Sequence, residues 1–165
     1  MTTRLLLLVD DNPDESLLLT RALARGGLPE WKILGLPNGP LALDYLGRAQ
    51  AGEVPLPDLL LIDVRMAPIG GLQLLERVRK QLPELPAVMF STLESLADKI
   101  RAMDSGARGY FVKSPTFSDL VEFLRTFKPT AFAMRANALT HADAHSGLTD
   151  SFSRLSSPVR YPRAS

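Results

Sequence analysis

The chain has 165 residues, of which 45% are hydrophobic and 22% are charged. This composition is typical of a globular protein rather than a disordered or a membrane-embedded one. The sequence contains no cysteine. That absence excludes disulfides, cysteine-ligated metal centres and a cysteine nucleophile, and it agrees with a cytoplasmic location.

The formal net charge is +1, and residues 1–128 carry 15 Lys and Arg against 16 Asp and Glu. A module that binds duplex nucleic acid carries a basic excess, so we expect no nucleic-acid partner. The longest apolar runs, 5–9 and 59–62, are too short to cross a bilayer. We therefore expect no membrane partner, and the short first run also argues against a secretory signal.

Short apolar runs alternate with amphipathic stretches from the start of the chain to residue 128. The apolar runs predict five strands, at 5–9, 31–36, 58–62, 87–90 and 109–112. The amphipathic stretches predict five helices, at 13–25, 40–48, 72–81, 96–104 and 117–128. Continuous apolar strands that alternate with helices indicate an α/β fold with a parallel sheet covered on both faces. Right-handed crossovers make a doubly wound sheet the simplest arrangement.

The first helix has clear predicted ends. Asn12 is a good N-cap, Pro13 suits the first helical position, and Glu15 would complete a capping box. Gly26 and Gly27 would end the helix.

The composition changes after residue 128. Residues 130–144 are rich in alanine and could form one further helix, whereas 146–165 combine serine and proline with few apolar residues. We therefore divide the chain into a domain at 1–128 and a C-terminal extension at 129–165 that ends in a flexible tail.

Acidic residues follow two of the predicted strands. Asp10 and Asp11 follow the first strand, and Asp63 follows the third. In a sheet of order 2-1-3-4-5, these strands are neighbours and their carboxyl ends form the ligand-binding crevice. Three converging carboxylates repel one another unless a cation lies among them, and Mg²⁺ suits oxygen ligands.

A hydroxyl and a lysine are predicted at the same edge of the sheet. Ser91 follows the fourth strand and Lys113 follows the fifth. Each residue alone would more often be a turn or surface residue. Together with the carboxylates, they form a set that can accept and hold a phosphoryl group.

The chain from 4 to 128 resembles the receiver domain of two-component response regulators, in its single-domain, chemotaxis-type form. Four stretches carry this resemblance: LLLLVDDN at 5–12, PDLLLID at 57–63, VMFST at 88–92 and GARGYFVK at 106–113. The resemblance implies a flavodoxin-like receiver fold and phosphorylation by a histidine kinase or a phosphotransfer protein.

The resemblance also implies roles for the acidic residues. Asp63 matches the phosphoacceptor, Asp11 the direct Mg²⁺ ligand and Asp10 its acidic neighbour. Asp63 is also a metal ligand in this family, and the backbone carbonyl of Arg65 falls where the family supplies another.

Four further residues match positions that respond to phosphorylation in members of this family. Ser91 matches the switch hydroxyl, with the adjacent Thr92 as its rival. Tyr110 matches the aromatic residue that turns inward on activation, and Lys113 matches the lysine that binds the phosphoryl group. In the family, these residues remodel a surface that corresponds here to 96–104, 109–112 and 117–128.

Two loops depart from the family pattern. After Asp63, the proline comes one place late, at Pro68, and Gly70 replaces an acidic residue. After Lys113, Ser114 precedes the proline that the family usually has directly after its lysine. Because a cis bond without proline is costly, we expect Lys113–Ser114 to be trans, or any cis bond to lie at Ser114–Pro115.

Other residues suggest regulation and partners. Arg65 and Leu93 lie two residues after Asp63 and Ser91, and their side chains could shield a phosphoryl group and slow its hydrolysis. Phe123 and Phe127 lie off the predicted core stripe of the last helix, where they either cover the start of the extension or form an interaction surface. A homodimer through the switch surface or the extension is one expected assembly.

The leading hypothesis is a stand-alone receiver, not an enzyme, that signals to a downstream protein by a phosphorylation-dependent change of its surface. An alternative is a receiver-like interaction module that works without phosphate. A Mg²⁺-dependent phosphohydrolase is a third hypothesis, but that chemistry typically needs an Asp two residues after the nucleophile, where this chain has Arg65.

Overall fold

The computed structural model describes residues 2–130. It contains a five-stranded parallel sheet with the order β2-β1-β3-β4-β5, which confirms the predicted topology. The strands are β1 (Arg4–Val9), β2 (Trp31–Leu36), β3 (Leu59–Asp63), β4 (Ala87–Ser91) and β5 (Tyr110–Val112). The helices are α1 (Glu15–Arg25), α2 (Gly39–Gln50), α3 (Gly71–Gln81), α4 (Leu96–Asp104) and α5 (Ser118–Thr126).

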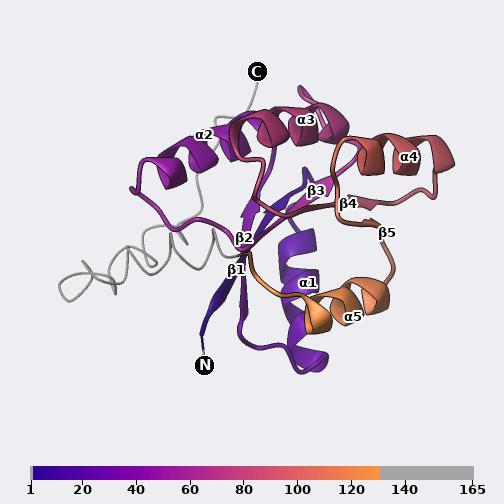
Figure 1. Cartoon of the computed structure of the whole chain (residues 1–165). Helices are drawn as coiled ribbons and strands as arrows, with labels where there is room; N and C mark the ends of the chain where they lie inside the picture. The colour runs from indigo at the N-terminus through magenta and orange to yellow at the C-terminus, as the bar shows by residue number, and fades with distance from the viewer. Residues whose placement is uncertain (1, 131–165) are drawn as a thin grey trace, which may run out of the picture.

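Helices cover both faces of the sheet. Figure 1 shows α2, α3 and α4 on one side and α1 with α5 on the other. Alternate residues of β1 enter the two resulting cores: Leu7 and Val9 pack toward α2 and α3, whereas Leu6 and Leu8 pack toward α1 and α5. This division explains why β1 is a continuous apolar run rather than an alternating one.

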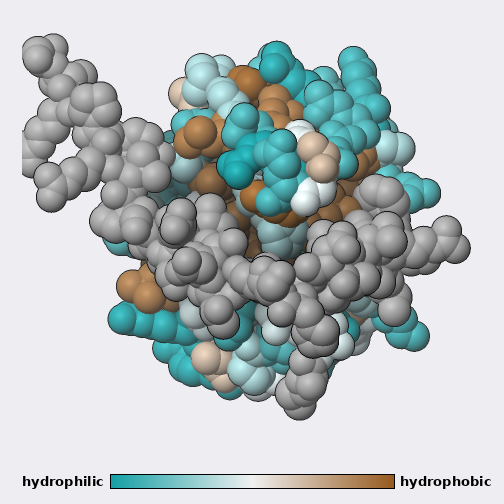
Figure 2. Space-filling view, turned by 90° about the vertical axis from the view of Figure 1, so that its left-hand side faces the viewer, coloured by the Kyte–Doolittle hydropathy of each residue, from teal (hydrophilic) through white to brown (hydrophobic). Residues whose placement is uncertain are grey.

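The surface seen from one side is mixed in character. On the face shown in Figure 2, hydrophilic residues alternate with apolar ones across the described part of the chain. Among residues 2–130, no helix is both long enough and apolar enough to span a membrane.

Helix α1 begins two residues later than its sequence predicts. Its N-cap is Asp14, which makes no side-chain capping bond, and the first helical residue is Glu15. The side chain of Asn12 instead accepts a hydrogen bond from the backbone N–H of Asp14 at 3.1 Å, which is an Asx turn. The predicted capping box is therefore wrong, and the side chain of Glu15 is available for another contact.

Helix α5 is shorter than predicted, and its aromatic residues are differently placed. Phe117 precedes the helix with a left-handed φ of 53°. Phe127 is buried, with its ring centroid 5.7 Å from that of Trp31 and 5.7 Å from that of Phe123. The ring of Phe123 also lies 5.2 Å from that of Phe111. The hypothesis of an interaction surface is therefore wrong for Phe127, because this side chain completes the core beneath α1 and α5.

The described residues end at 130, so the predicted helix at 130–144 and the tail at 146–165 lie essentially outside the described part of the chain. Within that part, the cis peptide bond is Ala67–Pro68. The prediction that Lys113–Ser114 is trans is thereby confirmed.

Candidate functional site

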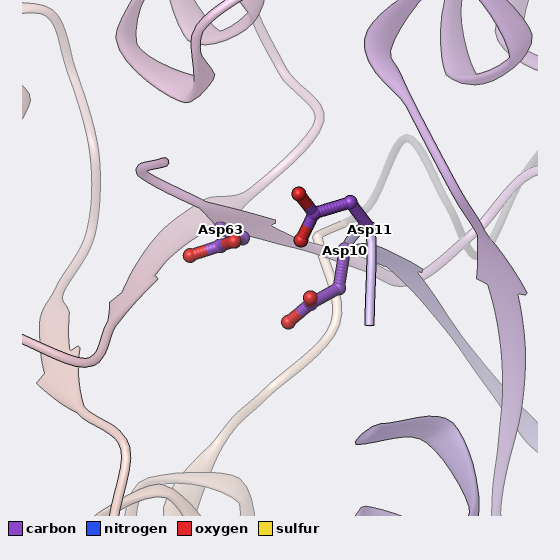
Figure 3. Close-up of side chains that lie close together, drawn as sticks. All are labelled: Asp10, Asp11 and Asp63. Atoms are coloured by element: carbon purple, nitrogen blue, oxygen red, sulfur yellow. The ribbon is translucent and has the colours of Figure 1, made fainter. Parts of the chain in front are cut away.

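Three carboxylates meet at the carboxyl end of the sheet. Asp10 follows β1 and Asp63 ends β3, and the pairing of Val9 with Ile62 brings these strand ends together. Figure 3 shows the side chains of Asp10, Asp11 and Asp63 close to one another. One oxygen of each carboxylate lies within 4.8 Å of the others, with Asp10 and Asp63 buried and Asp11 exposed. The sequence prediction of a converging acidic cluster is confirmed.

Backbone contacts fix Asp10 in the crevice. Its own N–H donates to the carbonyl of Leu36 at 3.0 Å, which extends the pairing of β1 with β2 by one residue. Its Oδ1 accepts a hydrogen bond from the N–H of Asn12 at 2.9 Å. With Oδ1 held in this way, Oδ2 faces the interior of the site, where it accepts a hydrogen bond from Lys113.

Lys113 joins the acidic groups. Its Nζ donates to Oδ2 of Asp10 at 2.5 Å and lies 3.8 Å from Oδ1 of Asp63. It also lies 3.6 Å from Oε1 of Glu15 and 5.2 Å from the centroid of the Phe90 ring. Lys113 follows β5, and β5 reaches this edge of the sheet because it pairs with β4.

The site alters the protonation of its groups. Burial raises the pKa of Asp63 to about 6, the charge of Lys113 opposes this, and the charges of Asp10 and Asp11 add to it. Burial disfavours the charged form of Lys113, but the hydrogen bond that Lys113 donates to Asp10 and the charges of Asp10, Asp63 and Glu15 outweigh burial and raise its pKa. The lysine is therefore held protonated among the carboxylates.

The structure distinguishes the two hydroxyl candidates by position. Ser91 is the last residue of β4 and is fully buried, and its Oγ accepts a hydrogen bond from the N–H of Leu93 at 3.2 Å. Thr92 lies outside the strand and is exposed. Because Asp63 pairs with Phe90, Ser91 lies one residue beyond the partner of the acidic residue. This placement favours Ser91 as the hydroxyl of the site.

Three predicted residues lie at the margin of the site. The hydroxyl of Tyr110 donates to the carbonyl of Leu93 at 3.1 Å. Leu93 is itself 57% exposed. Arg65 lies in the loop after β3, where its exposed guanidinium is 3.5 Å from Oδ2 of Asp98 in α4. No contact of the Arg65 side chain with the acidic cluster is present among the described residues.

Glu15 is the site residue that the sequence analysis missed. Its carboxylate is buried and lies against Lys113, because α1 begins at this residue. The predicted capping box assigned its side chain to the backbone of Asn12. The signal that could have revealed it is its place four residues after Asp11, on the first turn of a helix that starts from the acidic edge.

The donor set fits a hard divalent cation. Carboxylate oxygens are the ligands that Mg²⁺ prefers, and three of them can reach a common point here. Three carboxylates, those of Asp10, Glu15 and Asp63, lie within 4 Å of a single ammonium group, so added positive charge would relieve their repulsion. Such a site could hold a cation and, beside it, an anionic group bonded to Asp63.

The comparison with known proteins agrees with this arrangement. The family model of the response regulator receiver domain matches residues 6–125. The probable methanogenesis regulatory protein FilR2 of Methanothrix harundinacea is 32% identical over 126 residues, which cover 75% of this chain and 81% of FilR2. The response regulator protein VraR of Staphylococcus saprophyticus is 31% identical over 90 residues, 50% of this chain and 43% of VraR. The chain thus spans less than half the length of that relative.

Solved structures show the same architecture. The response regulator TrrA of Thermotoga maritima, solved with Mg²⁺ and beryllofluoride, superposes with a TM-score of 0.61 at 25% identity. The superposition covers 74% of this chain and 97% of TrrA. The likeness therefore extends over the part of this chain that forms the sheet and its helices.

Proposed function

Because the chain belongs to the response regulator receiver domain family, we propose that it accepts a phosphoryl group on Asp63 and signals through the resulting change of its surface. Receiver domains are signalling domains, and the carboxylates of Asp10 and Asp63 lie together with the ammonium group of Lys113 here. The observation that carries the proposal is the contact of one ammonium group, Lys113, with both Asp10 and Asp63 in a buried crevice.

Phosphoryl transfer needs a nucleophile and positive charge that stabilises the oxygens of the transferred group. A carboxylate oxygen of Asp63 attacks the phosphorus of a phosphohistidine on a histidine kinase or a phosphotransfer protein. The bond between phosphorus and nitrogen breaks, its electron pair stays on the imidazole nitrogen, and that nitrogen takes up a proton from the solvent. Lys113 is held protonated beside Asp63 and supplies positive charge to the oxygens of the transferred group.

We propose Mg²⁺ as the cation of this site. Asp10, Asp11, Asp63 and the backbone carbonyl of Arg65 would hold it. When bound, it neutralises charge on the carboxylates and on the phosphoryl oxygens. The fit of three carboxylate oxygens within 4.8 Å supports this assignment, and TrrA, in which Mg²⁺ and beryllofluoride are bound, shares the fold.

Ser91 and Tyr110 would transmit the change. We propose that the hydroxyl of Ser91, whose Oγ accepts a hydrogen bond from the N–H of Leu93, moves toward the new phosphoryl group and donates to it. That movement disturbs the loop whose carbonyl at Leu93 accepts the Tyr110 hydroxyl. The loop leads directly into α4, so the surface of α4, β5 and α5 is the one expected to change.

The exposed side of α4 is suited to protein contact. Leu96, Ile100 and Met103 are 72%, 52% and 46% exposed. We propose that a downstream protein, or a second copy of this chain, binds this surface. We also propose that the protein acts as a stand-alone receiver in the cytoplasm. The near-neutral charge of residues 1–128 supports a protein partner over nucleic acid.

An interaction module that works without phosphate is the second candidate function. The altered loop after Asp63 favours it, since the proline lies at Pro68 and a glycine stands at Gly70. The intact buried cluster of Asp10, Asp63 and Lys113 argues against it, because such a cluster costs stability and serves no need of a passive module.

Intact-mass analysis after incubation with Mg²⁺ and a small acyl-phosphate donor tests the proposal. We expect one added phosphoryl group in the wild type and none in Asp63→Asn. The absence of an adduct, together with no binding of beryllofluoride, would favour the module that works without phosphate.

A further inference from the structure

One carboxylate at this site has no part in the proposed chemistry. Glu15 is 9% exposed, and its Oε1 lies 3.6 Å from Nζ of Lys113. Its Oε2 is buried and has no hydrogen-bond partner among the described residues. A buried carboxylate with one unpaired oxygen lowers stability unless a nearby positive charge compensates it, and Lys113 is the cation beside it.

Ordinary helix-end roles do not explain this side chain. The N-cap of α1 is Asp14, and no side-chain capping bond is present at that end. A negative charge in the first turn favours the helix dipole, but an exposed side chain such as Asp14 provides that benefit without being buried. Glu15 is instead turned toward the acidic crevice.

Lys113 is balanced between two carboxylates. Asp10 anchors its Nζ at 2.5 Å, and Glu15 and Asp63 flank it at the nearly equal distances of 3.6 and 3.8 Å. A phosphoryl group on Asp63 requires this ammonium on the Asp63 side. A contact that holds Nζ of Lys113 toward α1 therefore destabilises the phosphorylated state.

We propose that Glu15 is a positioning residue that competes with Asp63 for Lys113 and so weakens the binding of a phosphoryl-like anion at the site. The inference rests on the proposed function, because it assumes that Lys113 pairs with the anion bound at Asp63. Glu15 acts in two ways with the same sign: it attracts the lysine, and its own charge repels the anion.

The test measures the affinity for beryllofluoride, a mimic of the phosphoryl group, at saturating Mg²⁺ in the full-length protein. We expect Glu15→Gln to bind it about fivefold more tightly than the wild type, since one close charge interaction is changed. Glu15→Met, which removes both the charge and the polar atoms, is expected to shift the affinity in the same direction. Its thermal midpoint shows whether the substituted protein is folded.

Asp14→Asn is the matched control. It removes the same charge from the adjacent residue, but Asp14 is exposed and makes no contact with Lys113. We expect its affinity to stay within about twofold of the wild type, because exposed charges are screened. Equal gains in Asp14→Asn and Glu15→Gln would reduce the effect to net charge and overturn the proposal.

A second readout needs no metal. In a metal-free crystal structure of Glu15→Gln, we expect Nζ of Lys113 to lie closer to Asp63 than the present 3.8 Å. An unchanged position of Nζ would overturn the inference alone. So would a beryllofluoride affinity of both Glu15→Gln and Glu15→Met that is equal to or weaker than that of the wild type. Failure of the wild type itself to bind beryllofluoride would instead overturn the proposed function.

Discussion

The protonation of Asp63 links the site to the stability of the fold. Its pKa of about 6 lies above the ordinary value of 3.8, so between these values the folded protein holds a proton that the unfolded chain has released. Without metal, stability therefore falls as pH rises from about 4 to 6. Above pH 6, the ionisation of buried Asp63 lowers the free energy of unfolding by its full amount, about 3 kcal/mol.

Asp63→Asn is expected to remove this cost. In metal-free buffer, its free energy of unfolding should exceed that of the wild type by up to about 3 kcal/mol at pH 7.5. The difference should shrink as pH is lowered through 6 toward 4. Urea unfolding at several pH values measures it, and a difference that is constant with pH would contradict the proposed origin of the raised pKa.

Arg65 and Leu93 provide a second prediction at the scale of single residues. Both are exposed at the margin of the site, at 64% for the Arg65 side chain and 57% for Leu93. If they shield the phosphoryl group from water, Arg65→Ala and Leu93→Ala should each shorten the lifetime of phosphorylated protein by about fivefold, which corresponds to about 1 kcal/mol of barrier. Arg77→Ala, an exposed change on α3, serves as control, and unchanged lifetimes would refute shielding.

At the scale of elements, the start of α3 is pressed against the end of β3. A Cβ on Gly71 would overlap the carbonyl oxygen of Asp63 and lie 2.9 Å from Cα of Val64. Because both neighbours are backbone atoms, the chain must shift to accommodate any side chain there. The glycine thus allows the close turn that carries Asp63.

Gly71→Ala is therefore expected to lower the free energy of unfolding by about 3 kcal/mol or more and to weaken Mg²⁺ binding. Gly70→Ala is the matched control, since a Cβ there meets nothing within 4 Å and its φ of −66° suits any residue. Its expected effect is within about 1 kcal/mol. Thermal unfolding and Mg²⁺ titration measure both, and equal effects in the two variants would contradict this account of the turn.

The elements also show how far sequence reasoning reaches. Period and run length predict all ten elements, because strands buried on both faces leave a continuous apolar signal. The sheet order 2-1-3-4-5 comes instead from the resemblance to receiver domains, and the structure confirms it. The first residue of α1 is mispredicted because the side chain of Asn12 closes an Asx turn that competes with capping. Phe127 is misjudged because its contact with Trp31 joins two segments that are far apart in the sequence, which no local pattern reveals.

On the scale of the whole molecule, the parallel sheet assembles the site. Asp10, Asp63 and Ser91 all come from strand ends, so a correct strand order predicts that they converge. Glu15 comes from a helix, and it faces Lys113 at the first residue of α1, a start that the sequence analysis placed two residues too early. Sequence reasoning therefore finds the strand-borne part of the site and misses the helix-borne part.

The central claim is that Asp63 carries the phosphoryl group. The most direct measurement treats the full-length protein with Mg²⁺ and a small acyl-phosphate donor, reduces it with borohydride and maps the product by peptide mass spectrometry. Reduction converts an aspartyl phosphate to homoserine. We predict homoserine at position 63 and unmodified aspartate at Asp10 and Asp11. Homoserine at another position, or none in a protein that binds beryllofluoride, would contradict the account.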